Sequence, residues 1–223
     1  MVESYRSEEE QVEDLKRWWK ENGQGVVIGA VLALGLGFGW QGWQKSQQTA
    51  TENASLAYQQ MLQSLSLAEE ASAEPARKLA QALKDEHRGT TYAQFAALHL
   101  ARLAVNDGEP ARAEEELRWV LAMADNGDDV HQVAQLRLAR VMAATERADE
   151  ALSLLQGATT DFVASYAIAR GDILLSLGRE ADALVAYESA AATLDPSAPV
   201  PRTLQEKLQY LGARQADTPS EAG

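Results

Sequence analysis

The feature that most constrains this chain is a run of 23 residues without an ionisable side chain, between Glu21 and Lys45. Its core, from Gly25 to Trp43, reads GVVIGAVLALGLGFGWQGW. As a helix, such a run measures about 35 Å at roughly 1.5 Å per residue, which is enough to cross a hydrocarbon layer of about 30 Å. Few soluble helices are apolar on all sides over this length. We therefore predict one transmembrane helix at residues 23–44.

The charges on the two sides of this run predict its orientation. Three basic residues stand just before it, whereas only one, Lys45, stands close behind it. Because basic residues collect on the cytoplasmic side of membrane helices, we expect a cytoplasmic stub at residues 1–22 and a periplasmic domain after the span, in a bacterial inner membrane. The acidic start of the chain argues against a cleaved signal peptide, which begins with basic residues. The three basic residues are Lys16, Arg17 and Lys20, with Arg6 further back.

Small residues recur every four positions along the predicted span, at Gly25, Gly29, Ala33 and Gly37. Such a stripe lets a second transmembrane helix approach closely. Glycine is also simply tolerated in membrane helices, so the stripe has a second explanation that needs no partner. If a partner helix exists, the sequence leaves open whether it belongs to another copy or to a different protein.

The composition excludes several classes of function. The absence of cysteine removes disulfides, thiolate nucleophiles and cysteine-based metal sites. The net charge is −13, and residues 46–223 alone carry 15 Lys and Arg against 26 Asp and Glu, a net charge of −11. So acidic a chain repels phosphate backbones, and we expect no nucleic acid partner.

Motifs for catalysis or for metal binding are not found in the sequence. The three histidines have no second ligand at metal-binding spacing, and neither a nucleophile elbow nor a phosphate-binding loop is present. The run of Glu114, Glu115 and Glu116 is interpreted as a solvated helix face, since runs of one charge usually are. We therefore expect no enzyme activity, no metal and no cofactor, and an envelope hydrolase is disfavoured.

Residues 45–213 are predicted to be an all-α domain, because helical segments alternate with short breaks and no strand-like alternation occurs. Between the breaks lie eight or nine helices of ordinary length. The tail at residues 214–223 is small and polar and is predicted to be disordered. The predicted breaks fall at 72–75, 87–90, 106–110, 126–128, 146, 157–160, 178 and 195–201.

Within this domain, the segment Ala167–Pro196 has the small and large residues of a tetratricopeptide repeat at the expected spacing. Two earlier segments carry degenerate versions, and the equivalent positions 108, 146 and 178 are separated by 38 and 32 residues, close to the usual period of about 34. One helix pair cannot bury its apolar face alone, so pairs must stack into a solenoid with a concave face. A further pair is predicted within residues 46–87, and a capping helix at 201–211. The matching residues of the clearest repeat are Gly171, Leu174, Gly178, Ala183, Tyr187 and Ala190.

The repeat alignment predicts a protein-binding groove. It places Arg102, Arg140 and Asp172 at equivalent positions on the first helices of successive pairs, a face that normally lines the concave side. The two arginines are suited to hold carboxylates or backbone carbonyls of a bound chain, while ion pairs with neighbouring glutamates are the alternative. Four apolar residues are predicted to share this face or to belong to the core: Phe95, Leu98, Val133 and Leu136.

Five segments of the chain match a known family: EEEQVEDLKRWWKENG at Glu8–Gly23, the span ending in GWQGW, ASLAYQ at Ala54–Gln59, LRLARV at Leu136–Val141 and RGDILLSLG at Arg170–Gly178. From end to end, the chain resembles the YfgM family, the ancillary subunits of the bacterial SecYEG translocon. The resemblance implies a protein beside the protein-conducting channel that associates with a membrane-anchored periplasmic chaperone of the prolyl-isomerase type and assists newly exported client proteins. It also implies that the stub restrains the Rcs response regulator. A passive scaffold subunit of another envelope complex is the alternative.

Overall fold

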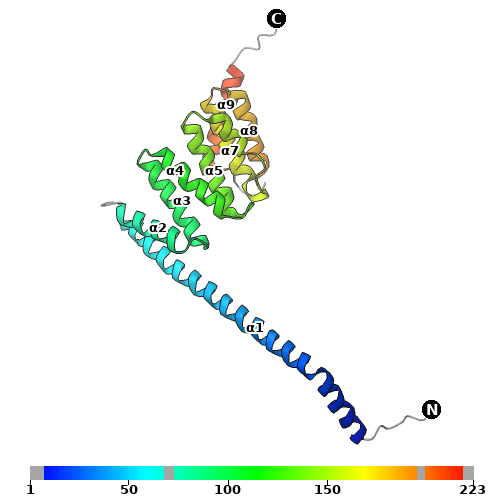
Figure 1. Ribbon diagram of the computed structural model, residues 1–223. Helices are drawn as coiled ribbons and strands as arrows, with labels where there is room; N and C mark the ends of the chain where they lie inside the picture. The colour runs from blue at the N-terminus through cyan, green and yellow to red at the C-terminus, as the bar shows by residue number, and fades with distance from the viewer. Residues whose placement is uncertain (1–7, 68–72, 195–198, 218–223) are drawn as a thin grey trace, which may run out of the picture. The chain divides into compact units, whose positions relative to one another are not determined.

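The computed structural model describes residues 8–67, 73–194 and 199–217, and within these ranges the chain is helical without any strand. The predicted all-α fold is confirmed (Figure 1). Contacts divide the chain into two compact units between Glu52 and Asn53. The elements are α1 (Glu8–Leu67), α2 (Glu74–Glu86), α3 (Thr91–Asn106), α4 (Pro110–Met123), α5 (Asp129–Ala144), α6 (Ala148–Leu154), the 3₁₀ helix η1 (Thr160–Phe162), α7 (Val163–Ser176), α8 (Glu180–Ala192) and α9 (Arg202–Asp217).

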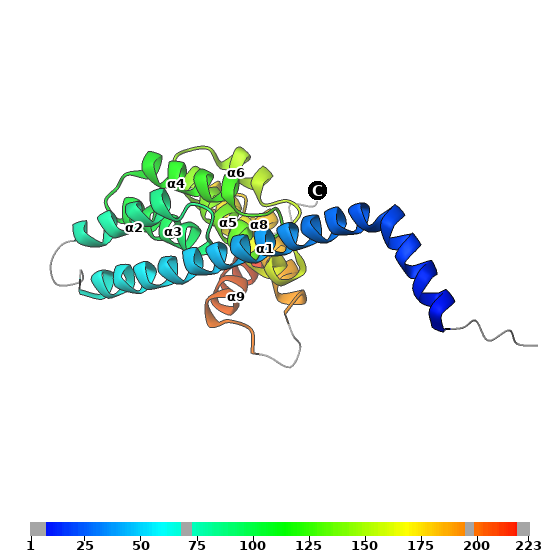
Figure 2. The same ribbon diagram turned by 60° about the horizontal axis from the view of Figure 1, so that its bottom comes forward.

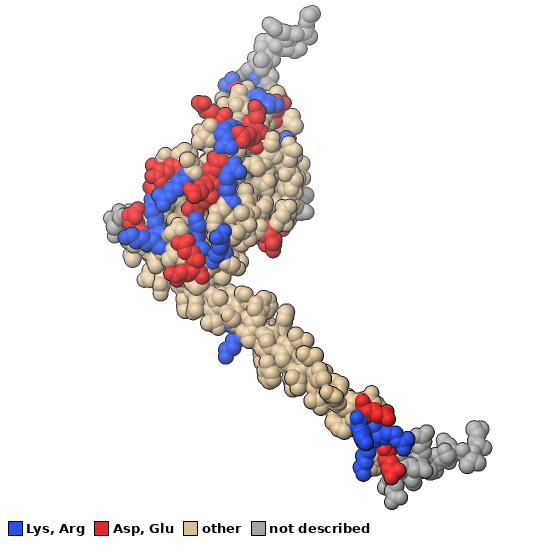
Figure 3. All heavy atoms as spheres, in the orientation of Figure 1, with Lys and Arg blue, Asp and Glu red and all other residues tan. Residues whose placement is uncertain are grey.

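The first unit is the N-terminal part of α1, which is apolar and exposed. A window of this helix reaches a mean hydropathy of 1.6 and is long enough to cross a membrane. Leu36 and Phe38 are 76% and 70% exposed, which is unfavourable in water and favourable in a hydrocarbon layer. Figure 3 shows this stretch almost free of charged atoms, with a charged cluster at its N-terminal end. The prediction of a single N-terminal membrane-spanning helix is confirmed, while its bounds at 23–44 remain a prediction.

The second unit stacks its helices in the order of the sequence. Three helix pairs, α3–α4, α5–α6 and α7–α8, follow one another, and their first helices lie side by side, α3 against α5 and α5 against α7 (Figure 1). The part of α1 after Glu52 packs with α2 and α3 through Met61, Leu83 and Leu100. At the other end α9 packs on α8, as predicted for a capping helix (Figure 2).

The three pairs turn in the same way at the positions that the repeat alignment makes equivalent. Gly108, Glu146 and Gly178 all have a positive φ, of 75°, 62° and 73°. In each turn the next residue donates its N–H to the carbonyl oxygen five residues earlier, which closes the helix end in a Schellman motif. The predicted register of the repeats is thus confirmed by the backbone. The three bonds are Glu109 to Ala104 (2.8 Å), Arg147 to Met142 (3.0 Å) and Arg179 to Leu174 (2.9 Å).

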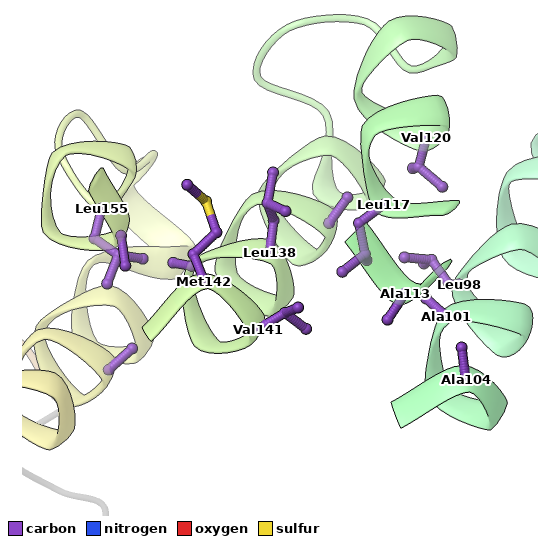
Figure 4. Packing of buried hydrophobic residues seen from close by; sticks show 14 of the residues in the cluster. Leu98, Ala101, Ala104, Ala113, Leu117, Val120, Leu138, Val141, Met142 and Leu155 are labelled. Atoms are coloured by element: carbon purple, nitrogen blue, oxygen red, sulfur yellow. The ribbon is translucent and has the colours of Figure 1, made fainter. Parts of the chain in front are cut away.

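Small residues let the helices of each pair approach, and larger ones fill the space between pairs. Figure 4 shows apolar side chains of α3, α4 and α5 pointing toward one another, Leu98, Leu117 and Leu138 among them. In the third pair the small residue is Gly171, and a Cβ built there would lie 2.6 Å from Cδ1 of Tyr187. Only glycine therefore fits beneath this tyrosine.

Two helices extend beyond their predicted limits. The helix α1 continues without a break through Leu67, so the first helix of the predicted pair within 46–87 is not a separate element. The helix α9 runs to Asp217, past the predicted start of the tail at residue 214. The rest of that tail lies outside the described residues.

Candidate functional site

Two adjoining hollows follow the seam between α3 and α5. The larger has a volume of about 530 Å³ and the smaller about 200 Å³. Arg102 and Arg137 border both hollows, so the two form one groove with arginines in its middle. The larger hollow is lined by Ala101, Arg102, Val105, Pro110, Leu117, Arg137, Arg140, Val141, Ala144 and Thr145, and the smaller by Tyr58, Phe95, Leu98, His99, Arg102 and Arg137. We call this set of residues the α3–α5 groove.

The arginines of the α3–α5 groove lie close enough to affect one another. Arg137 donates from Nη1 to the carbonyl oxygen of Leu98 at 3.3 Å. Burial, followed by the charges of Arg102 and Arg140, lowers the pKa of Arg137. Neither Arg102 nor Arg140 forms an ion pair with a residue that the structure describes. The groove is therefore a local concentration of positive charge in an acidic domain.

Aromatic side chains and a histidine form the wall of the smaller hollow. The Oη of Tyr58 lies 3.1 Å from Nε2 of His99, and its ring lies 5.6 Å from that of Tyr92 and 5.8 Å from that of Phe95. Burial, together with the nearby charges of Arg102 and Arg137, lowers the pKa of His99. Burial also raises the pKa of Tyr58. At neutral pH this wall is therefore uncharged and presents ring surfaces.

The residues predicted for the groove fall into three groups. Arg102, Arg140, Phe95 and Leu98 line it. Val133 and Leu136 line neither hollow and are partly buried against the main core, in agreement with the alternative interpretation of these positions. The third group is Asp172 alone.

Asp172 lies outside the α3–α5 groove, in the third pair. It accepts a hydrogen bond from Oη of Tyr187 at 2.6 Å and pairs with Lys207 of α9. At Asp172 the repeat position is thus occupied by an internal ion pair, of the kind that is the alternative predicted for Arg102 and Arg140. The equivalent Arg102 and Arg140 have none among the described residues.

Sequence reasoning missed several residues of the groove. Arg137 precedes Arg140 by one helical turn and Val105 follows Arg102 by one turn, so a search of the positions three residues away finds both. His99 precedes Arg102 in the same way. Tyr58 comes from α1, and no local pattern connects it with α3.

The interpretation of the glutamate run in α4 as a solvated face is wrong for Glu116, whereas Glu115 is exposed. Its side chain is 8% exposed and its Oε2 lies 2.5 Å from Nζ of Lys84, whose side chain is 10% exposed. The same ammonium lies 5.1 Å from the ring centre of Trp119. Glu114 accepts hydrogen bonds from Arg118 and Arg147, which lower its pKa. These contacts tie α4 to α2 and to α6.

Three other features were candidates for a functional site: acidic and histidine clusters, His131 and the small-residue stripe of α1. Within the three described ranges, His, Asp and Glu form no group of three that is suited to hold a metal ion. In α5, Nδ1 of His131 is buried and has no hydrogen-bond partner among the residues that the structure describes. On α1, a Cβ built at Gly25, Gly29 or Gly37 would meet no atom within 4 Å, so the small-residue stripe is open in the single chain.

The fold and the groove define a single-pass membrane protein with a tetratricopeptide-like repeat domain. The family model described as a tetratricopeptide repeat-like domain matches residues 16–213. The ancillary SecYEG translocon subunit of Escherichia coli is 33% identical to this chain over 212 residues, which are 94% of this chain and 99% of that protein. Proteins of the same name from Haemophilus influenzae and Aggregatibacter actinomycetemcomitans are 32% identical over 82% of this chain and 88% of their own length. The chain belongs to the family of ancillary SecYEG translocon subunits.

No solved structure matches the chain at a significant level. The family relationship predicted from the sequence is confirmed by the curated relatives. Their names and the apolar helix α1 fit a single-pass protein of the inner membrane.

Proposed function

We propose that this chain is a non-enzymatic, translocon-associated protein of the inner membrane whose α3–α5 groove binds newly exported chains and assists their folding or transfer. The names of its relatives support the association with SecYEG. The observation that carries the binding role is the groove itself, an open hollow of about 530 Å³ where Arg102 and Arg140 lack a carboxylate among the described residues. Free donors beside apolar surface are what an extended polypeptide needs as a binding site.

The proposed topology follows the charges around the span. Residues 1–22 form a cytoplasmic stub, 23–44 the transmembrane helix, 45–213 the periplasmic repeat domain and 214–223 a tail. Because the chain has no cysteine, single cysteines placed at Gln11 and Gln47 report the two sides without background. A membrane-impermeant maleimide should label Gln47→Cys and not Gln11→Cys in spheroplasts. Labelling of only Gln11→Cys would reverse the topology.

A membrane anchor has a physical consequence for such a binder. It raises the local concentration of the groove near chains that leave the channel, so a modest affinity is sufficient. The resemblance to the family adds two further partners to the proposal, a membrane-anchored prolyl-isomerase-type chaperone and, through the stub, the Rcs response regulator.

Site-specific photocrosslinking tests the binding role. Val105 lines the larger hollow and is 51% exposed, whereas Val185 on α8 is 65% exposed and lies outside the groove. Each is replaced by p-benzoylphenylalanine in the full chain, in inner membranes that hold a stalled exported protein. Crosslinks from position 105 and none from 185 are expected. Absence of crosslinks from both positions would favour a passive scaffold.

Purification from native membranes tests the association with the translocon. A Gly29→Leu, Gly37→Leu variant closes the small-residue stripe. The control variant, Val27→Leu with Val31→Leu, adds bulk on the opposite side of the same helix, because each of these valines is about 200° around the helix from Gly29. Translocon subunits and the chaperone should copurify with the parent and the control, and less with the glycine variant. Equal recovery with the glycine variant would place the contact in the repeat domain, and no recovery with the parent would overturn the association.

A further inference from the structure

We infer that the α3–α5 groove selects extended segments in which one carboxylate side chain stands between two apolar side chains. This inference rests on the proposed function, because it specifies which parts of an exported chain the groove takes. Its basis is that the two hollows meet at Arg102 and Arg137, so that positive charge lies between two apolar compartments.

The two compartments accept apolar groups of different kinds. The larger one offers aliphatic surface from Ala101, Val105, Leu117 and Val141. The smaller one offers ring and aliphatic surface from Tyr58, Phe95 and Leu98. Burial of apolar side chains in both supplies affinity, and the guanidinium groups between them supply selection, because they bind carboxylates with two parallel hydrogen bonds.

The spacing along α3 fits an extended segment of five residues. Phe95 and Val105 are ten residues apart, which is about 15 Å along a helix. In an extended chain, side chains on one face recur every two residues, or about 6.7 Å, so the first and fifth side chains lie about 13 Å apart. A segment of the form apolar-x-acidic-x-apolar whose ends reach the two compartments has its acidic residue midway between them, about 3 Å along α3 from the level of Arg102 and within reach of its long side chain.

Arginines on the second helices of the pairs and in the turns have a carboxylate partner within the chain, unlike Arg102 and Arg140 of the groove in the described ranges. Arg112, Arg118, Arg147 and Arg179 each lie within 3.3 Å of a carboxylate oxygen of this chain. Arg102 and Arg140 are left without such a partner in the described ranges. Because the domain around them is acidic, a phosphate-rich polymer is repelled while a single carboxylate within an apolar segment is accepted.

Three capped peptides test the inference with the full-length chain in detergent micelles. They are acetyl-Gly-Leu-Ser-Glu-Ser-Leu-Gly-amide with a fluorescent label, the same peptide with Gln for Glu, and the same peptide with Ser for both Leu. The Glu peptide should bind about tenfold more tightly than either of the others by fluorescence anisotropy. Equal affinity for the Glu and Gln peptides, or no binding up to about 1 mM, would overturn the inference.

Matched arginine variants show which residues cause the preference for the Glu peptide over the Gln peptide. Arg102→Gln should remove most of the preference for Glu over Gln. Arg170→Gln changes an exposed arginine of α7 that borders neither hollow, and it should keep the preference. A preference that survives Arg102→Gln together with Arg140→Gln would contradict selection by these arginines.

The ring of His99 provides an independent readout. Burial and, after it, the charge of Arg102 lower the pKa of His99. A carboxylate bound beside Arg102 offsets the effect of this charge, so the Glu peptide should raise that pKa relative to the Gln peptide. NMR titration of labelled histidine, assigned with His99→Gln, measures this shift. If position 105 crosslinks to exported chains but the peptides show no preference, the inference fails and the proposed function stands. Peptide preference without crosslinks would support selection by the groove and contradict its role toward exported chains.

Discussion

The second and third helix pairs use the same repeat position for different purposes. Arg140 in α5 lies in the groove without an ion pair among the described residues, whereas Asp172 in α7 is held by Tyr187 and Lys207. The difference comes from the neighbour of each pair in the stack. The third pair is followed by the capping helix α9, which brings Lys207 to Asp172, so the charge at the end of the stack is used to fasten the cap. An equivalent position in a repeat is therefore a shared location and not a shared role.

The largest expected effect breaks the packing that is special to the third pair. Gly171→Ala places a Cβ against the ring of Tyr187 and should lower the free energy of unfolding by about 2 kcal/mol. Adding Tyr187→Leu, the residue type at the equivalent positions 117 and 155, should relieve the clash. Chemical denaturation followed by circular dichroism measures both. If the double variant is no more stable than the sum of the single changes predicts, the two sites are not coupled and the explanation fails.

A smaller effect should come from the turn of the second pair. Glu146 has a φ of 62°, in the left-handed region that the other two turns fill with glycine. Glu146→Gly should raise the free energy of unfolding by about 1 kcal/mol, because it relieves the backbone strain of a residue with a Cβ. Gly178→Ala should lower it by a similar amount in the third pair. A neutral or destabilising Glu146→Gly, measured in the same denaturation experiment, would contradict this account.

The fastening of α9 should contribute less again. The side chains of Asp172 and Lys207 are 40% and 33% exposed, so water screens the pair and its coupling should be about 0.5 kcal/mol. A double-mutant cycle with Asp172→Asn and Lys207→Met measures it. Arg140→Gln in the second pair is the matched control and should leave stability unchanged. A loss of stability with Arg140→Gln would mean that this arginine has a structural role.

The smallest expected effect is a pH dependence confined to the first pair, where His99 stands at a position that the third pair fills with Ala169. Burial and nearby arginines lower the pKa of His99, so the folded chain binds a proton there more weakly than the unfolded chain. The stability due to neutral His99 is fully present above its ordinary pKa of about 6.5 and declines as the pH falls below it. As the pH is lowered from about 7 to about 5.5, the free energy of unfolding of the parent should therefore fall relative to that of His99→Gln. A constant difference would rule out this titration.

Much of the fold follows from local sequence patterns. The span depends on an uncharged run, and the turns at 108, 146 and 178 depend on residues within one helical turn of the break. These signals need no knowledge of distant contacts, which is why the helices and the repeat register are predictable. Glu146 shows the limit, because a residue unsuited to the left-handed region stands where only the repeat alignment indicates the turn.

The site is less predictable because its partners come from different helices. The repeat alignment places Arg102 and Arg140 on the groove face, but whether each has an ion pair depends on residues that tertiary packing brings near. Lys207 lies 35 residues from Asp172 and Lys84 lies 32 residues from Glu116, so neither pair leaves a local pattern. For this reason the sequence alone predicts a solvated run of glutamates, although one member is buried.

The stacking of neighbours also governs how this domain folds. Each helix of the second unit packs chiefly against those next to it in the sequence, so most loops that must close are short and carry a small entropic cost. Because folding of such a stack can nucleate in any pair and spread to its neighbours, we expect the first pairs to fold before the C-terminal part of the chain has been synthesised. Without cysteine, its maturation also needs no oxidation step. The repeat domain is thus expected to reach its native state early, with the docking of α9 as the last event.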